Sequence, residues 1–300
     1  MIPQSEFRER IERFRKRLEE RGVDLGFIWG DEFYNANVRY LSDYAPILEY
    51  AAVVVPVKDS PILLAGPECE DLAKNSSKID EVLIAKEMQI PGEEYPYSKM
   101  VSVKEVLKKY KPKKIGVVEL TSMPLFLYEA IKNVGAEIVD VTDILEQMRA
   151  VKSENELKLI RKAYEVANKG LEVGVESVKP GKKEYEIAAE VAGAMWDEGV
   201  EQLSHVLMIA SGERTRGMMV LSRPSNRTIQ DGDPVIIDIG TVCYGYYSDH
   251  ARTVIAGKSR PEKIVKMIQV AAEAQEKTIE AMKPGVKGYE VDKIAREIVT

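Results

Sequence analysis

The sequence predicts an α/β protein of two domains, and three patterns lead to this prediction. Helical and strand-like segments alternate over residues 1–145, and a capped helix start then marks a new unit near residue 152. After it, a pair of helices joined by Lys-Pro-Gly occurs twice, with a β-branched stretch between the two copies. We therefore predict one domain at residues 1–150 and a second at residues 151–300.

The first predicted domain begins with an amphipathic helix over residues 5–21 that ends near Gly22. Apolar, β-branched runs then predict strands, with helical patterns between the later ones. The further elements predicted here are strands at 24–29, 51–57 and 61–65, a helix at 101–110, a strand at 113–119, a helix at 123–134 and a strand at 136–141. Such alternation is typical of a domain built around a central sheet.

The second predicted domain begins at a helix cap. Ser153 is the expected N-cap, and Glu156 is its partner three residues on in a capping box. We place the domain boundary near residues 146–152. The helix predicted at 183–198 has alanine and glycine on one face, which suits close packing on a curved sheet.

An internal duplication spans the second predicted domain. The Lys-Pro-Gly turn at 179–181 recurs at 283–285, and a Tyr-Glu pair follows each turn at the same offset of 104 residues. A period this long indicates a duplicated half-domain and not a solenoid. We expect the helix pairs within 154–198 and 262–300 to share one fold.

Two aspartates, Asp238 and Asp249, lie around a predicted hairpin. Residues 234–240 and 246–256 are apolar, β-branched runs and are predicted as its strands. If the turn is centred directly after Cys243, the two aspartates face each other across the strands. An ionised carboxylate in such apolar runs is costly unless a partner neutralises it.

Directly opposed carboxylates have Cβ atoms about 4.5–5.5 Å apart, close enough to hold two divalent ions about 3.5–4 Å apart. Without a cation, like charges at that distance do not both stay ionised. We therefore interpret the pair as a dinuclear metal site. The alternative is that Asp238 ends a strand as a turn former and Asp249 is a solvated hairpin acid.

Composition favours a soluble enzyme and excludes some partners. A net charge of −6 and a pI of 5.4 argue against nucleic-acid binding, which needs clustered basic residues. We predict no signal peptide, no membrane span and no membrane partner. The two cysteines, Cys69 and Cys243, fall in different predicted domains, so we expect a reducing, cytoplasmic location. Interleaved lysine and glutamate favour a thermophilic source.

The chain resembles the pita-bread hydrolases, which include prolidase, aminopeptidase P, methionine aminopeptidase and creatinase. Residues 1–145 are similar to the creatinase/prolidase N-terminal domain. The segments that carry the resemblance from Leu145 onward, beside the repeated Lys-Pro-Gly helix pair, are R-A-V-K-S-E-N-E-L (149–157), I-A-S-G (209–212), D-G-D-P-V-I-I-D-I-G (231–240) and G-Y-Y-S-D-H-A-R-T-V (245–254). The resemblance implies a creatinase-like α/β domain followed by a pita-bread α+β domain.

The resemblance also implies two divalent ions, Mn, Co or Zn, with Asp238 binding one ion and Asp249 bridging both. A histidine and two glutamates further along normally complete the family's site, and one glutamate carries the proton. The chain reaches Thr300 before any of them, so we expect the second half of the pita-bread domain to be truncated. The implied chemistry is metal-assisted hydrolysis of a small peptide or amide.

The sequence departs from the family at one point. Peptidases of the family place a histidine after I-A-S-G, and residues 216–222 contain none. We predict that His205, on the strand before I-A-S-G, is a catalytic residue that reaches the site instead. The alternative is a packed sheet histidine. His250 is predicted to face the opposite side of its strand and to be structural.

Arg39 lies in a segment that in this family approaches the active site across a dimer interface. We predict that it binds a substrate carboxylate and that the protein is a homodimer. The alternative is a surface arginine at a strand edge.

We therefore predict a metal-dependent hydrolase, with Xaa-Pro dipeptides as the best single substrate. One alternative is a creatinase-like enzyme that cleaves a non-peptide C–N bond. The other is a non-catalytic binding protein that reuses the fold.

Overall fold

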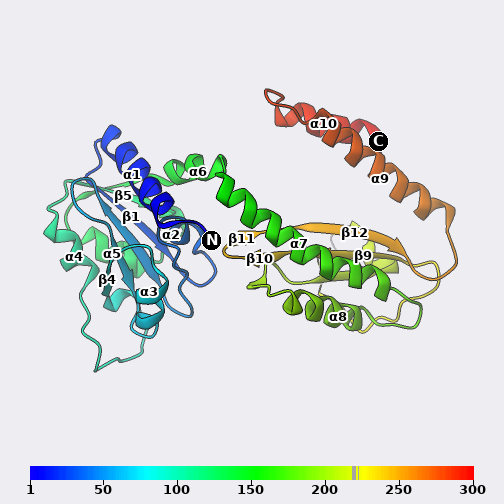
Figure 1. Cartoon of the computed structure of the whole chain (residues 1–300), viewed down its shortest axis with the longest axis horizontal. Coiled ribbons are helices and arrows are strands. Elements are labelled where there is room, and N and C mark those ends of the chain that lie inside the picture. The colour runs from blue at the N-terminus through cyan, green and yellow to red at the C-terminus, as the bar shows by residue number, and fades with distance from the viewer. Residues whose placement is uncertain (218–220, 222) are drawn as a thin grey trace. The chain divides into compact units, whose positions relative to one another are not determined.

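The fold is described from a computed structural model of the chain, which describes residues 1–217, 221 and 223–300. The chain divides into two compact units, Met1–Leu157 and Lys158–Thr300. Each unit is described below by itself. Figure 1 labels many of the elements of both.

The first unit is built around a mixed six-stranded sheet with the order β4-β3-β2-β1-β5-β6. The strands are β1 (Leu25–Gly30), β2 (Ala51–Pro56), β3 (Ile62–Ala65), β4 (Glu81–Ile84), β5 (Lys114–Val118) and β6 (Glu137–Asp140). Strand β1 runs antiparallel to β2 and parallel to β5. Every residue of β1, β2 and β3 is buried, because helices cover both faces of the sheet and leave only its edges to water.

Helices of the first unit pack on the sheet through two apolar clusters. They are α1 (Gln4–Glu20), α2 (Ala36–Ser42), α3 (Glu70–Ser76), α4 (Val103–Lys109), α5 (Leu125–Lys132) and α6 (Thr142–Ala150). In α1, Phe7, Phe14 and Leu18 are all buried on one stripe, which is the spacing that predicted this helix. The first unit is therefore the mixed α/β domain that the sequence predicts.

Four elements of this unit were not among the predicted ones: α2, α3, β4 and α6. Helices α2 and α3 are seven residues long, and α3 buries only Ala73. Strand β4 lies at the sheet edge and buries only Ile84. Elements such as α3 and β4, with one buried side chain each, carry almost no hydrophobic periodicity, so the sequence pattern does not reveal them. This reason does not extend to α2 and α6, which bury several side chains each.

The second unit carries a helix pair against small antiparallel sheets. Its main elements are α7 (Glu154–Ser177), α8 (Glu184–Asp197), β7 (Gln202–Leu203), β8 (Met208–Ser211), β9 (Pro234–Ile239), β10 (Thr241–Cys243), β11 (Tyr246–Tyr247) and β12 (His250–Ile255). One sheet has the order β11-β10-β7 and the other β12-β9-β8. Figure 1 shows α7 and α8 alongside these strands, and Val166, Val191 and Ile237 lie in the shared core.

The predicted capping box at the start of α7 is confirmed. The backbone N–H of Glu156 donates to Ser153 Oγ at 3.2 Å, and the backbone N–H of Ser153 donates to Glu156 Oε2 at 2.8 Å. Glu6 of α1 accepts hydrogen bonds from Ser153 and Asn155 at 2.7 and 2.9 Å. The first turn of α7 is thus fixed to the first unit, although α7 continues into the second.

The duplication recurs in the element bounds. Helix α9 (Glu262–Ala281) ends 104 residues after α7 ends. Helix α10 (Gly288–Val299) begins 104 residues after α8 begins. In both copies a glutamate caps the second helix, because Lys183 N donates to Glu186 and Lys287 N donates to Glu290. Helices α9 and α10 pack on each other.

Among the described residues, every helix is either too short or too polar to span a lipid bilayer. Cys69 and Cys243 are buried free thiols in different units, as the sequence predicts.

Candidate metal centre

The hairpin that carries the two aspartates has a different register from the predicted one. Asp238 pairs with Ala251, so Asp249 is not its direct partner. The aspartates are diagonal neighbours, and Asp249 lies two residues before Ala251. The prediction that they face each other directly is wrong by two residues.

The turn explains this register. Strands β10 and β11 pair Cys243 with Tyr246, which leaves Tyr244 and Gly245 as the two turn residues. Both have positive φ values, 52° and 79°. Two-residue hairpin turns of type I′ need this conformation at both positions, and glycine is favoured at the second. The turn is therefore centred one residue later than predicted, and the predicted strand 246–256 is divided into β11 and β12.

The two aspartates nevertheless lie on one side of the sheet, because a slip of two residues preserves the alternation of side chains. Along β9, Val235, Ile237 and Ile239 are buried toward α7 and α8, whereas Asp238 is partly exposed on the other face. Strand β9 is the central strand of its sheet, between β8 and β12. Asp238 therefore has a rigid backbone on both sides.

His205 joins the two aspartates. One ligand atom of His205, one of Asp238 and one of Asp249 lie within 4.8 Å of one another. His205 Nε2 is 3.4 Å from Asp238 Oδ1, and His205 Nδ1 is 2.8 Å from Ser204 Oγ. The predicted location on a strand is wrong, since His205 lies in the bend between β7 and β8. A bend frees the imidazole from the fixed alternation of a strand, so the ring can turn toward the aspartates.

Gly240 permits this approach. The backbone N–H of Ser204 donates to Gly240 O at 3.0 Å, so the Ser204–His205 segment lies directly on the end of β9. A Cβ at residue 240 would overlap Ser204 Oγ and the carbonyl oxygen of Ser248, and would lie 3.1 Å from His205 Cε1. The glycine of the D-I-G motif is therefore a packing requirement of the site.

We expect Gly240→Ala to lower the free energy of unfolding by about 1–3 kcal/mol, because the new methyl group must displace backbone. Gly193→Ala is the matched control, since a Cβ there meets nothing within 4 Å. An exposed helical glycine replaced by alanine stabilises by about 0.4–1 kcal/mol. Urea unfolding of both variants gives the comparison, and a Gly240→Ala protein as stable as wild type would contradict the close packing.

The charges of the cluster favour a cation. Asp238 Oδ1 is buried and makes no hydrogen bond within the described chain. Among the same residues, no lysine or arginine forms an ion pair with Asp238 or Asp249. Two carboxylate oxygens and an imidazole nitrogen are a donor set that suits Zn, Mn or Co. The residues present therefore fit a divalent metal ion.

His250 lies on the opposite face, as predicted. Its ring meets Tyr164 of α7 edge to face, with centroids 5.3 Å apart. Burial, with the nearby charge of Arg252, lowers the pKa of His250 below its ordinary value. Tyr164 also donates a hydrogen bond of 3.3 Å to the backbone oxygen of Asp249. Tyr164 of α7 thus holds the backbone of Asp249 and the start of β12 from the helix-packed face of the sheet.

An apolar cleft of about 440 Å³ lies on the aspartate face of the sheet. Its sheet wall contains Ile236, Ala251 and Thr253, which alternate with the residues that face α7 and α8. Asp238 and Ala251 are paired neighbours, so the cleft begins beside the carboxylate cluster. The opposite wall is formed by α9, including Ile264 and Ile268.

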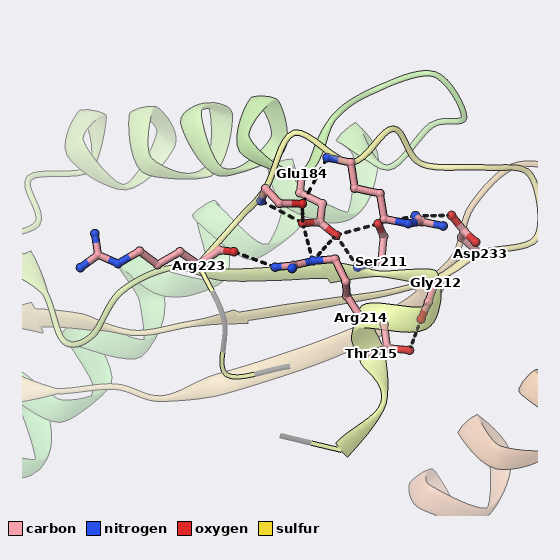
Figure 2. A network of polar contacts seen from close by, with 9 residues as sticks. Glu184, Ser211, Gly212, Arg214, Thr215, Arg223 and Asp233 are labelled. Atoms are coloured by element: carbon pink, nitrogen blue, oxygen red, sulfur yellow. Dashed lines mark hydrogen bonds and ion pairs between the residues drawn. The ribbon is translucent and has the colours of Figure 1, made fainter. Parts of the chain in front are cut away.

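A buried glutamate holds segments together on the other face of this sheet, where α8 packs. Glu184, in the first turn of α8, is 0% exposed. It accepts hydrogen bonds from the backbone and hydroxyl of Ser211, both 2.8 Å, and from those of Ser225 at 2.9 and 2.6 Å. Arg214 Nε lies 3.1 Å from its carboxylate. Figure 2 shows this contact beside those of Ser211 with Glu184. Glu184 thus ties the end of β8 and the chain after residue 223 to α8.

Two predictions about the site are not resolved by this geometry. Arg39 lies in α2 of the first unit and not at a strand edge, and its role in binding a substrate carboxylate stays a prediction. The stretch 216–222, where the family's histidine is missing, includes 218–220 and 222, which lie outside the described residues.

Sequence reasoning missed Ser204, Gly240 and Glu184 as contributors to this region. Gly240 was visible within D-I-G, but its role depends on Ser204, which is 36 residues earlier. Glu184 follows the Lys-Pro-Gly turn among other charged residues, and only its burial distinguishes it.

Two family models match the chain. Residues 158–300 match metallopeptidase family M24, and residues 10–151 match the creatinase/prolidase N-terminal domain. Their junction lies close to the division between the two compact units.

Known proteins are similar over nearly the whole chain. The Xaa-Pro dipeptidase of Pyrococcus horikoshii is 31% identical over 294 residues, which cover 97% of this chain and 76% of that protein. The crystal structure of the prolidase from Pyrococcus horikoshii has a TM-score of 0.82 at 31% identity and covers 97% of this chain and 77% of its own. The X-Pro aminopeptidase structure from Thermotoga maritima has a TM-score of 0.80 at 26% identity, covering 96% and 76%.

Proposed function

Because this chain belongs to metallopeptidase family M24, the prolidase-like pita-bread hydrolases, we propose that it hydrolyses Xaa-Pro dipeptides with divalent metal held by Asp238 and Asp249. Family membership makes it a hydrolytic, metal-dependent enzyme. The observation that carries the proposed site is the buried Asp238 Oδ1, which has no hydrogen-bond partner among the described residues and lies beside Asp249 and His205.

The protein's own contribution is to hold the metal-binding carboxylates and to orient the substrate. When bound, divalent ions supply Lewis-acid polarisation of a carbonyl and ionise water near neutral pH. Asp238 is held by pairing on both sides of β9, so its carboxylate stays in place when charge develops. The apolar wall of Ile236 and Ala251 offers contact area for an apolar ring such as proline.

We also propose finer features that the family suggests. The site holds two ions, and Mn or Co are the ions to load first. The enzyme is a cytoplasmic homodimer, and Arg39 binds a carboxylate group of the substrate. The free, buried Cys69 and Cys243 suit a reducing compartment. The interleaved lysine and glutamate residues suit a thermophilic source.

The test is hydrolysis by the full chain after Mn²⁺ or Co²⁺ loading. We expect release of free proline from Xaa-Pro dipeptides at a slow rate, because residues 216–222 lack a histidine and loss of one such donor costs about 10²–10³ in rate. Metal-free protein and a dipeptide without proline are the controls. Cleavage of creatine or cyclic amides in place of Xaa-Pro peptides would favour the creatinase-like alternative, and no turnover of any of them would favour a binding protein.

A further inference from the structure

We infer that His205 is a nitrogen ligand of the metal held by Asp238 and Asp249. This inference rests on the proposed metal site and adds to it a third ligand from the same chain. The family's own ligand histidine is expected later in the chain, and the sequence contains only two histidines, His205 and His250.

The spacing of the two atoms fits a shared ion. His205 Nε2 and Asp238 Oδ1 are 3.4 Å apart. Two ligands on one tetrahedral ion, each bonded at about 2.0–2.2 Å, are separated by about 3.4 Å. Asp249 completes a group whose ligand atoms all lie within 4.8 Å of one another.

The contact is not a hydrogen bond. Asp238 Oδ1 has no hydrogen-bond partner within the described chain, although Nε2 of His205 is its neighbour. At 3.4 Å the pair is beyond the usual range for N–H···O bonds. A buried carboxylate oxygen facing an imidazole nitrogen without such a bond is costly, and an ion between the two atoms removes that cost.

The other ring nitrogen is already engaged. His205 Nδ1 lies 2.8 Å from Ser204 Oγ. Metal-binding histidines commonly donate their second N–H to an oxygen, which fixes the tautomer and directs the lone pair of the first nitrogen to the metal. Ser204 can accept this hydrogen bond, and Gly240 keeps Ser204 in position because no Cβ intervenes.

His250 provides an internal control. It lies on the other face of β12, against Tyr164, and cannot reach the cluster from there. Within residues 1–300, an imidazole bound to the metal at the aspartates must therefore come from His205.

The experiment is pulsed EPR of Mn²⁺ bound to the full chain labelled with ¹⁵N-histidine, together with calorimetric Mn²⁺ affinity. We expect a nitrogen hyperfine coupling that is lost in His205→Asn and kept in His250→Gln. His205→Asn should weaken Mn²⁺ binding by more than about tenfold, and Ser204→Ala should weaken it by about tenfold while keeping the coupling. Thermal unfolding without metal checks that each variant is folded.

The outcomes separate the inference from the proposed function. Wild-type protein that binds Mn²⁺ without nitrogen coupling overturns the His205 assignment and leaves the aspartate site standing. Coupling that survives in His205→Asn also overturns it. Wild-type protein that binds no Mn²⁺ overturns both. The coupling is measured first on wild type, so a variant that fails to fold does not decide the result.

Discussion

Asp238→Asn and Asp249→Asn should each abolish stoichiometric metal binding and hydrolysis. Each substitution removes a charged oxygen donor from a group in which no described lysine or arginine balances the carboxylates. Loss of an outer-shell partner alone typically costs about 10–100-fold in metal affinity, so loss of a carboxylate ligand should cost more. Elemental analysis after desalting gives the bound metal per chain.

Thermal unfolding gives an independent readout of the same substitutions. Metal should raise the melting temperature of wild type and leave that of either variant unchanged, because only wild type gains binding free energy. Asp197→Asn, an exposed substitution with the same charge change, is the control and should behave as wild type. Equal metal content in wild type and in both site variants would show that the aspartates are not ligands.

Glu184→Ala should lower the free energy of unfolding by about 3–5 kcal/mol, because it removes a fully buried carboxylate and leaves the partly buried Arg214 without its partner. Four hydrogen bonds from Ser211 and Ser225 to the same carboxylate are lost as well. The matched control is Glu213→Gln. Its ion pair with Arg216 is exposed, with relative side-chain accessibilities of 73% and 74%, and such pairs contribute about 0–1 kcal/mol. Urea unfolding measures both.

The effect of Glu184 should depend on pH. Burial alone raises the pKa of its carboxyl, but the hydrogen bonds from Ser225 and Ser211 outweigh burial and bring the pKa below its ordinary value of 4.5. The charged form is thus favoured by folding. Its contribution is present above pH 4.5 and is lost as the pH falls through the lowered pKa. A stability difference between wild type and Glu184→Ala that did not shrink in acid would contradict this account.

The sequence predicted those features that depend on local periodicity or on repetition. The buried stripe of α1 and the alternation along β9 are visible because a side chain's environment repeats with the helix or strand period. The 104-residue repeat gave the helix pairs, and their bounds follow it. The two aspartates fall on one face in the predicted register and in any register shifted from it by an even number of residues. That part of the site was therefore predictable.

The same patterns did not give the register of the hairpin, because the conformation of the turn sets that register. A turn at Tyr244 and Gly245 and one centred a residue earlier place the same residues on the same faces, so alternation alone does not distinguish them. The positive φ of Tyr244, which is uncommon in a non-glycine residue, decided the choice.

By itself, then, the sequence determined the fold class, the duplication and the carboxylate pair. Only the tertiary structure decided that His205 joins that pair and that Glu184 is buried among Ser211, Arg214 and Ser225. The physical reason is that these contacts join segments about 27–44 residues apart through bends and loops, where side-chain direction follows no period. Such directions are set by packing, as at Gly240, where the absence of a Cβ lets Ser204 and His205 approach.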